Sequence, residues 1–313
     1  MTRIAAIDIG TNTILMLVAD VREDGVVQVV RDEHTIARLG RGVDEQRFIL
    51  PETIQRVQHV LNEYVDIARR NNSTSIVACG TSALRDAKNN YEFLETIRSK
   101  LGLQINVVSG DEEASLTYHG AVGEFIPRLN DNSVAVLDIG GGSTEVIFGS
   151  GSALQIGTSY DVGAVRITER ILKQSPPELS ALNAADEFIR SHFSGLESNH
   201  VDELIGVAGT VTTLAAINLK LEAYDREKVG GTILTKDFVE EIYQQLRSAS
   251  LDEIHAIPQI LPQRADIFLA GIMILRAAMN ELGVLAITAS DRGLRYGLLM
   301  KEFRRLEQAG LLT

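Results

Sequence analysis

Two glycine-rich stretches decide the fold: Asp-Ile-Gly-Thr-Asn-Thr at residues 8–13 and Asp-Ile-Gly-Gly-Gly-Ser-Thr-Glu at residues 138–145. Each follows an apolar run, at residues 4–7 and 133–137, and each leads at once into a second one. Strand, tight glycine turn and strand is the pattern of a β-hairpin. Because the device recurs 130 residues later (138 minus 8), the sequence predicts an internal duplication on the scale of a domain.

Helical and strand patterns alternate after each hairpin. Pro51 suits the first position of a helix over residues 51–71, in which apolar residues recur at steps of three and four. Such alternation predicts mixed, largely parallel sheets with covering helices. The other predicted strands are 75–80, 103–108, 203–207 and 284–288. The other predicted helices are 91–101, one from about 109, 178–193, one that follows residues 208–210 and runs through 219, one that Thr235 caps and that carries Val239, Ile242 and Leu246, 264–282 and 291–306.

We therefore expect an α/β protein of two domains, residues 1–125 and 126–296. A C-terminal helix over about residues 297–313 is expected to pack back on the first domain. The chain has 313 residues, of which 45% are hydrophobic and 23% charged, the balance of a soluble globular protein.

Charge and cysteine content narrow the class of function. A net charge of −12 argues against general nucleic-acid binding, and a polyanionic substrate would need a local cluster of arginines, backbone N–H groups and metal. The single cysteine, Cys79, excludes an intramolecular disulfide and suits a reducing compartment. Neither a signal peptide nor a membrane-spanning apolar run is present in the sequence, so we expect a cytoplasmic protein without membrane contact.

The two glycine turns predict phosphate-binding loops. Glycine lets backbone N–H groups approach an anion, and neighbouring Ser and Thr hydroxyls add donors. A single turn of this kind is more typical of a plain hairpin, but here there are two, and an aspartate, Asp8 or Asp138, precedes each at a strand end. An aspartate beside phosphates commonly holds Mg²⁺. Glu145 either joins that metal shell or is a solvated hairpin charge, and the residues leave both readings open.

Six motifs occur in the order expected of one family, and the chain resembles the exopolyphosphatase and guanosine pentaphosphatase family over essentially its whole length. The motifs lie at residues 8–13, 80–85, 109–114, 138–145, 208–210 and 290–295. The resemblance implies a two-domain actin-like (ribonuclease H-like) fold that binds a phosphoanhydride in an interdomain cleft. It also implies that Glu113 activates the attacking water and that Arg85 contacts phosphate.

Together the motifs and the resemblance predict a site. The catalytic base is Glu113, and the Mg²⁺ ligands are Asp8, Asp138 and Glu145. The predicted phosphate- or substrate-binding residues are Thr11, Asn12, Thr13, Arg85, Gly140, Gly141, Gly142, Ser143, Thr144, Gly209 and Thr210. Arg292 and Arg295 either bind phosphate or lie on a solvated helix face.

The adjacent carboxylates Glu112 and Glu113 are expected to have different roles. Ser109 and Glu112 have the spacing of a capping box, in which the Ser109 hydroxyl bonds the N3 amide and Glu112 reaches back to the Ser109 N–H. Glu113 lies about 100° further around the helix, so we expect it to point freely into the cleft. The helix N-terminus is expected to favour its ionised form.

The predicted function is Mg²⁺-dependent hydrolysis of a terminal phosphoanhydride in inorganic polyphosphate or guanosine pentaphosphate. One alternative is an ATP-dependent small-molecule kinase on the same fold, and another is a nonenzymatic regulator that senses nucleotide. The sequence leaves open the physiological substrate, the preferred chain length, and whether the protein is a monomer or a homodimer.

Overall fold

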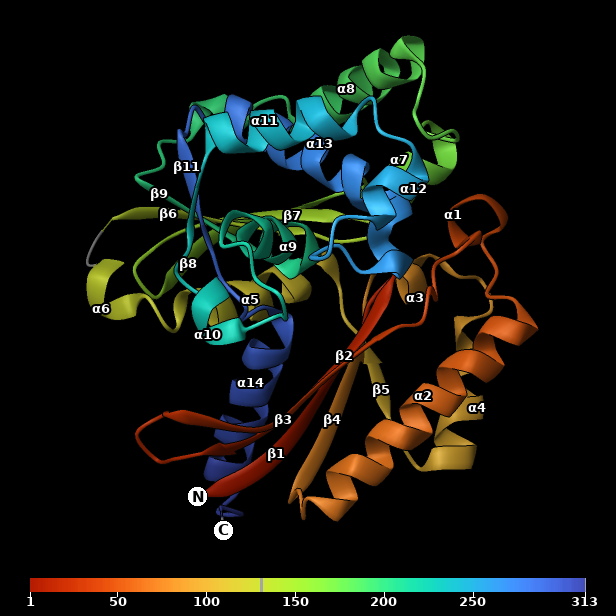
Figure 1. Ribbon diagram of the computed structural model, residues 1–313. Coiled ribbons are helices and arrows are strands. Elements are labelled where there is room, and N and C mark those ends of the chain that lie inside the picture. Colours follow the sequence, from red (N-terminus) through yellow and green to blue (C-terminus); the bar gives the residue numbers. More distant parts are fainter. Residues whose placement is uncertain (130–131, 313) are drawn as a thin grey trace. The chain divides into compact units, whose positions relative to one another are not determined.

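A computed structural model describes residues 1–129 and 132–312. The chain divides into two compact units, coloured by sequence in Figure 1. Unit 1 comprises Met1–Gly120 and Leu294–Thr313, and unit 2 comprises Ala121–Gly293. The chain thus changes unit after residues 120 and 293, compared with 125 and 296 in the sequence analysis.

Unit 1 is built on a five-stranded sheet in the order β3-β2-β1-β4-β5. The hairpin of β1 (Thr2–Ile9) and β2 (Thr13–Val21) continues antiparallel into β3 (Val27–Ile36). The strands β4 (Ser75–Gly80) and β5 (Ile105–Val107) extend the sheet parallel to β1. The predicted hairpin and parallel strands are confirmed, whereas β3 had not been predicted.

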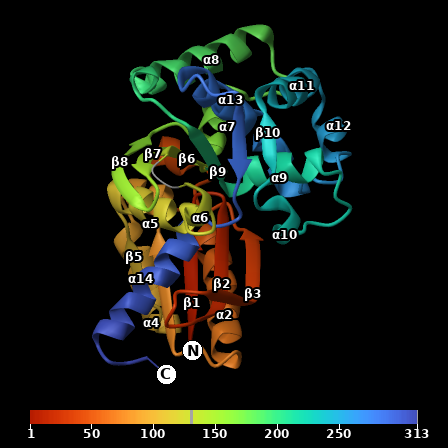
Figure 2. The same cartoon turned by 90° about the vertical axis from the view of Figure 1, so that its left-hand side faces the viewer.

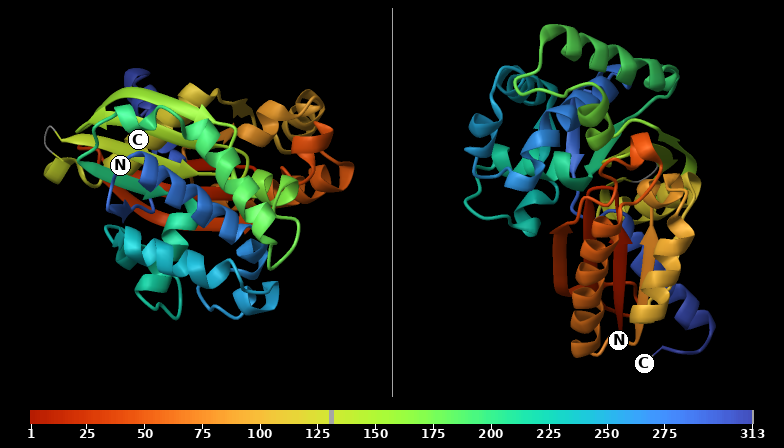
Figure 3. Two further views of the ribbon diagram at one scale, coloured as in Figure 1. Left: turned by 90° about the horizontal axis from the view of Figure 1, so that it is seen from above. Right: turned by 90° about the vertical axis from the view of Figure 1, so that its right-hand side faces the viewer.

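Helices cover both faces of this sheet, because successive side chains of a strand point to opposite faces. From β1, Ala5 and Ile7 belong to the core formed with α2 (Pro51–Arg70) and α4 (Asn90–Leu101). These helices lie in front of the sheet in the right-hand view of Figure 3. The helices α1 (Val43–Gln46), α3 (Ser82–Asp86) and α5 (Gly110–Val122) also lie wholly or mainly in this unit.

The opposite face of the first sheet packs on the C-terminal helix. Ile4 and Ala6 of β1 share a buried cluster with Leu299 and Phe303 of α14 (Leu294–Gln308), which lies in front of the sheet in Figure 2. With both faces covered, the run of residues 4–7 is apolar without alternation, as is typical of a doubly buried strand.

Unit 2 repeats this sheet with one strand added, in the order β10-β11-β9-β6-β7-β8. Read from its other end, the antiparallel meander β8-β7-β6 corresponds to β3-β2-β1, and the parallel strands β9 and β11 correspond to β4 and β5. The strands are β6 (Ser133–Ile139), β7 (Thr144–Ser150), β8 (Ala153–Tyr160), β9 (Glu203–Val207), β10 (Ile233–Thr235) and β11 (Ala286–Ala289).

The duplication extends to the register of the two hairpins. Asp8 pairs with Leu15 across the first hairpin, and Asp138 pairs with Glu145 across the second, so partners 130 residues apart (138 minus 8 and 145 minus 15) occupy the same places. The internal duplication predicted from the glycine turns is therefore confirmed residue by residue.

Both turns also close with the same hydrogen bond. The Gly10 N–H donates to the Thr13 carbonyl at 3.0 Å, and the Gly140 N–H donates to the Ser143 carbonyl at 3.0 Å. A Cβ added at either glycine would lie only 2.9–3.0 Å from the accepting oxygen, so both turns favour glycine at this position.

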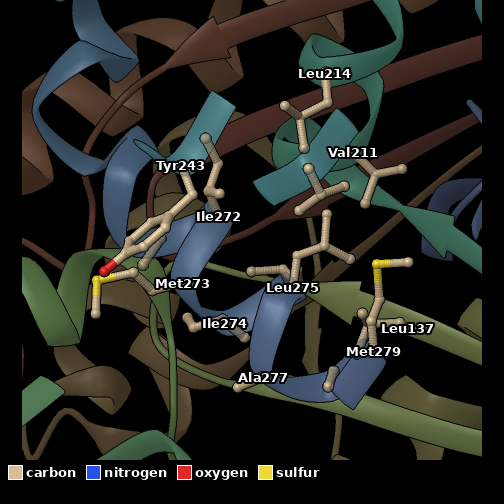
Figure 4. Close-up of a cluster of buried hydrophobic side chains, with 14 of the residues drawn as sticks. Leu137, Val211, Leu214, Tyr243, Ile272, Met273, Ile274, Leu275, Ala277 and Met279 are labelled. Atoms are coloured by element: carbon tan, nitrogen blue, oxygen red, sulfur yellow. The ribbon is translucent and has the colours of Figure 1, made fainter. Parts of the chain in front are cut away.

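The core of unit 2 is centred on α13 (Ala265–Glu281), which is apolar on nearly all sides because other elements surround it. Figure 4 shows its side chains between Leu137 of the sheet, Val211 and Leu214 of the helix α9 (Ala208–Asn218), and Tyr243 of the helix α11 (Lys236–Leu246). The other helices of the unit include α6 (Ile126–Leu129), α7 (Ala164–Arg170), α8 (Leu179–Phe193), α9 (Ala208–Asn218), α10 (Arg226–Val229), α11 (Lys236–Leu246) and α12 (Leu251–His255), with 3₁₀ turns at Leu196–Ser198 and Pro262–Arg264.

Candidate active site

In unit 1 the predicted site residues gather at the end of the sheet where the parallel strands β1, β4 and β5 finish. The Thr81 N–H donates to the Ile9 carbonyl at 3.3 Å, and the Val108 N–H donates to the Gly80 carbonyl at 3.0 Å. The loops that follow β1, β4 and β5 are thereby joined where these parallel strands end. Ligands of open α/β sheets bind at the carboxyl ends of such strands.

Glu113 and Arg85 form an ion pair at these carboxyl ends of the strands. Glu113 is only 6% exposed in the first turn of α5, and Arg85 Nη1 donates to its Oε2 at 2.5 Å. The same nitrogen donates to the Val108 carbonyl at 3.0 Å. Burial raises the pKa of Glu113, and Arg85 opposes that rise without cancelling it. The expectation of an unheld Glu113 whose ionised form is favoured was therefore wrong, because burial outweighs the helix N-terminus and an arginine binds the carboxylate.

Glu112 adopts only half of the predicted capping box. Its N–H donates to the Ser109 hydroxyl at 3.2 Å, as expected. Its carboxylate accepts instead from Lys301 Nζ of α14 at 2.5 Å, and within the described part of the chain no bond from the Ser109 N–H to this carboxylate is present. An ammonium group is a stronger donor to a carboxylate than a neutral amide, which explains the exchange.

The pKa of the Cys79 thiol depends on burial and on the carboxylates near it. The thiol is fully buried on β4, paired with Asp8 on β1. Its pKa is raised well above the usual range, first by burial and then by the negative charges of Asp8 and Glu113. Both carboxylates therefore lie within electrostatic reach of one thiol. Lys301 lowers this pKa less than burial and the carboxylates raise it, so the thiol stays protonated and is structural.

The first glycine loop, residues 10–13, is held by the segment that follows β3. The Thr11 carbonyl accepts from the Gly40 N–H at 2.8 Å, and the Asn12 carbonyl accepts from the Arg38 N–H at 2.8 Å. A Cβ on Gly40 would lie 2.2 Å from Thr11 Cγ2, so glycine permits this close approach.

The second glycine loop is held in the same way by α7. The carbonyls of Gly140 and Gly141 each accept a backbone hydrogen bond at 2.9 Å, from Ala164 and Val165 respectively. The Gly142 carbonyl accepts from Arg166 Nε at 2.7 Å. Three successive carbonyls of the loop therefore point at the start of α7.

The direction of these carbonyls fixes the direction of the N–H groups. In a planar trans peptide the carbonyl of one residue and the N–H of the next point in opposite directions. The N–H groups of residues 141–143 consequently point away from α7, and among the described residues no backbone carbonyl accepts from them. Convergent N–H groups of this kind form a concave anion-binding surface.

Asp138 and Glu145 lie on one face of the second sheet, because directly paired residues of an antiparallel ladder project to the same side. Glu145 is 1% exposed, and Ser159 on β8 donates to its Oε1 at 2.6 Å. Thr144 Oγ1 donates to the Val162 carbonyl at 2.5 Å, so this hydroxyl holds the loop. Among the described residues no group of three or more His, Cys, Asp or Glu side chains is arranged to hold a metal ion.

Arg264 is a further candidate site residue, which had not been predicted from the sequence. Its Nη1 lies 1.1 Å from where a Cβ on Gly209 would stand, so the guanidinium covers the first turn of α9 beside Thr210. Desolvation lowers the pKa of Arg264 to about 10. In the sequence, Arg264 was assigned to the long helix of residues 264–282, and only the motif at 208–210 marked this place.

Arg292 and Arg295 both make ion pairs, and their binding of phosphate stays a prediction. Arg292 pairs with Glu124 at 3.3 Å, and Ser290 Oγ donates to the same carboxylate at 2.7 Å. Arg295 is 6% exposed and forms an ion pair with Asp32. Both arginines therefore make ion pairs within their own units, and Arg295 is not on a solvated helix face.

Comparison with known proteins identifies the family. Residues 17–306 match the Ppx/GppA phosphatase family. The chain belongs to this family. The predicted class, two actin-like α/β units with mixed sheets flanked by helices, is confirmed. The interdomain cleft stays a prediction.

Several Ppx/GppA proteins resemble the chain over nearly all of its length. Exopolyphosphatase 2 of Mycobacterium tuberculosis is 32% identical over 96% of this chain and 98% of its own. The guanosine-5'-triphosphate,3'-diphosphate pyrophosphatase of Vibrio atlanticus is 32% identical over 96% of this chain and 60% of its own. The crystal structure of the Aquifex aeolicus family member superposes with a TM-score of 0.83, at 31% identity over 97% of this chain and 98% of its own.

No helix among the described residues combines the length and apolarity needed to cross a membrane.

Proposed function

We propose that this protein hydrolyses the terminal phosphoanhydride of inorganic polyphosphate or converts guanosine pentaphosphate to the tetraphosphate. The observation that carries the proposal is the second glycine loop, whose N–H groups point away from α7 and whose flanking residues are the paired carboxylates Asp138 and Glu145. The names of the relatives from Mycobacterium tuberculosis and Vibrio atlanticus support both substrates.

Mg²⁺ is the proposed cofactor, and the donor set fits it. Two carboxylate side chains on one face, Asp138 and Glu145, supply the hard oxygen ligands that Mg²⁺ prefers. Mg²⁺ commonly keeps several waters and takes phosphate oxygens as further ligands, so a third protein carboxylate is not needed. Asp8 is the proposed metal-side carboxylate of unit 1, at the duplicated position. When bound, the ion neutralises charge on the transferring phosphoryl group.

Glu113 is the proposed general base. A carboxylate whose pKa is raised by burial accepts a proton at neutral pH better than an exposed one. Arg85 binds Oε2, and Oε1 is the proposed acceptor of the proton from the attacking water. Arg85 also carries a second terminal nitrogen, and we assign that nitrogen to a substrate phosphate, as the planar guanidinium can serve two acceptors.

The substrate phosphates are proposed to bind to backbone N–H groups and arginines. These are the N–H groups of residues 141–143, the loop Thr11–Thr13, and the first turn of α9 at Gly209 and Thr210 with Arg264 above it. Such fixed donors stabilise the transferring phosphoryl group without reorganisation during the reaction. They also explain how a protein of net charge −12 binds a polyanion.

The test is phosphate release measured side by side on long-chain polyphosphate, tripolyphosphate and guanosine pentaphosphate, with Mg²⁺ and with excess chelator. We expect turnover of at least one substrate and its loss in chelator. The Glu113→Gln variant serves as the inactive control and Glu112→Gln as its neighbouring active one. Absence of turnover on all three substrates would refute the proposal. We place the reaction in the cytoplasm because a single cysteine suits a reducing compartment.

A further inference from the structure

The glycine loop of unit 2 depends on a buried arginine that faces its back. Arg166 on α7 is 5% exposed, and its Nε donates to the Gly142 carbonyl at 2.7 Å. Its Nη2 also contacts Asp161 at 3.3 Å, but that carboxylate is 77% exposed and therefore weakly coupled. The short bond to the Gly142 carbonyl is thus a buried contact between this guanidinium and the loop.

A glycine next to this arginine meets the same loop. Gly163 has an extended backbone, φ −139° and ψ 157°, which any residue adopts. Its backbone conformation therefore gives no reason for glycine. A Cβ there would lie 2.3 Å from the Gly141 carbonyl oxygen and 2.5 Å from the Gly142 carbonyl carbon, closer than real contacts allow. Gly163 is required because the loop packs directly on it.

Unit 1 repeats this arrangement with different residues. There the segment after β3 donates two backbone N–H groups to the loop carbonyls, and Gly40 makes room for Thr11. In both units an apolar–glycine pair, Leu39-Gly40 or Val162-Gly163, follows the third strand of the meander and contacts the back of the loop. In unit 2 a charged side chain, that of Arg166, also binds the loop, at the Gly142 carbonyl.

We propose that residues 162–166, here called the loop clamp, position the phosphate-binding N–H groups of residues 141–143, with Arg166 as a positioning residue that does not touch substrate. By fixing the Gly142 carbonyl, Arg166 fixes the Ser143 N–H on the other side of the same peptide plane. The inference rests on the proposed role of this loop in binding phosphate.

A charged donor gives the clamp two advantages over a neutral one. A hydrogen bond to a charged group is roughly twice as strong as a neutral one, so the peptide resists flipping when it meets an anion. The positive charge also polarises the Gly142–Ser143 peptide, which makes the Ser143 N–H a better donor. The clamp therefore predicts an effect on phosphate affinity from side chains behind the loop.

Gly163→Ala is the sharpest test, because it adds one methyl group behind the loop and removes no group that could bind phosphate. The matched control is Gly230→Ala in the same unit, where φ is −59° and the nearest atom to the new Cβ is 3.4 Å away. The probe is tripolyphosphate, measured as KM and kcat in the wild-type background and as Kd by calorimetry in the Glu113→Gln background. We expect Gly163→Ala to raise KM and Kd about tenfold or more, and Gly230→Ala to change neither.

Arg166→Ala and Arg166→Lys test the side chain itself, with Arg276→Met as control. Arg276 is a partly buried arginine of unit 2, paired with Glu240 and Asp186. We expect Arg276→Met to lower the melting temperature but leave KM unchanged. Arg166→Ala should raise KM about tenfold or more, and added guanidinium should restore part of the affinity. Arg166→Lys should fall between, since lysine donates without the planar fork.

The outcomes separate the clamp from the proposed reaction. If folded Gly163→Ala and Arg166→Ala proteins bind tripolyphosphate as tightly as wild type, the loop clamp is wrong. If Arg276→Met raises KM as much as Arg166→Ala, the effect is general loosening and the positioning role is also wrong. If the wild type binds tripolyphosphate but releases no phosphate from any substrate, the proposed reaction fails while calorimetry still decides on the clamp.

Discussion

Replacing Gly297 by alanine probes the contact that places the proposed base. Within unit 1, α14 crosses α5 at this glycine, and a Cβ on it would lie 1.9 Å from the Leu116 carbonyl oxygen and 2.6 Å from the carbonyl carbon. These are backbone atoms of α5, so no flexible side chain can move aside. The two helices must separate instead.

The size of the effect follows from the overlap. Ordinary contacts begin at 3.4 Å, so the methyl group requires about 1.5 Å of displacement (3.4 minus 1.9). Overpacking of this kind costs about 1–3 kcal/mol, whereas alanine in place of glycine stabilises a helix by about 1 kcal/mol. Because the overlap is with backbone, we expect the upper range to apply, a net loss of about 2 kcal/mol. At about 2–4 °C per kcal/mol the melting temperature should fall by about 4–8 °C.

The activity should fall further than the stability. Glu113 precedes Leu116 by less than one turn of α5, so a shift of that turn moves the carboxylate. A misplacement of about 1 Å in a catalytic geometry costs on the order of 100-fold in rate. We expect kcat for tripolyphosphate to fall by about that factor at temperatures where the protein is folded. The assays are phosphate release and urea unfolding followed by far-UV circular dichroism.

Arg304→Ala is the control, because this exposed residue of the same helix lies away from the crossing. It should leave both kcat and stability nearly unchanged. If Gly297→Ala were as stable as wild type, the close helix crossing would be wrong. If it were destabilised but kept its kcat, the crossing would stand and the placement of the base by α5 would not.

Further substitutions test the carboxylates and their partners. Glu113→Gln should abolish phosphate release while leaving tripolyphosphate binding intact. Because burial raises the Glu113 pKa, the wild type should also lose stability as pH rises through the folded pKa. Urea titrations at several pH values should show no such loss in the variant. Glu112→Gln should stay active, and breaking its part-exposed pair with Lys301 should cost less than about 1 kcal/mol in unfolding measurements. Asp138→Asn should raise the Mg²⁺ concentration for half-maximal rate, an idea that full activity in excess chelator would overturn. Arg85→Ala should raise KM and move the acid limb of the kcat/KM pH profile to higher pH, because the variant lacks a group that lowers the Glu113 pKa. An unchanged acid limb would contradict the coupling of Arg85 to the proposed base.

Much of the fold was readable because its signals are local. A glycine turn between apolar runs defines each hairpin within about ten residues, and its repetition exposed the duplication. The strand β3 (Val27–Ile36) escaped prediction because its centre, Arg31-Asp32-Glu33, is charged. It lies at the edge of the sheet, where only one neighbour constrains its side chains, so the apolar pattern of a strand is weak.

The site was readable only where one motif contains the chemistry. Glu113 could be named from its motif, but its partner Arg85 lies 28 residues away and no local pattern pairs them. Arg264 covers Gly209, although 55 residues separate the two in the sequence (264 minus 209). The guanidinium occupies the space that a Cβ on Gly209 would need, and only the folded structure shows this contact. The apolar–glycine pairs after each third strand were a detectable signal, since they recur at equivalent places in the duplication.

The duplication also shows where the two units differ in chemistry. With one register for both hairpins, Leu15 occupies the place of Glu145, so only the second unit pairs two carboxylates across the hairpin. Like charges directly opposite each other are destabilising unless a cation lies between them, and a single proposed Mg²⁺ needs only one such pair. The first unit instead has Glu113 bound by Arg85 at the carboxyl ends of its parallel strands. Two copies of one loop, each contacted by the segment that follows the third strand, are thus compatible with different chemical roles: the proposed base and Asp8 in one unit, and the paired metal ligands in the other.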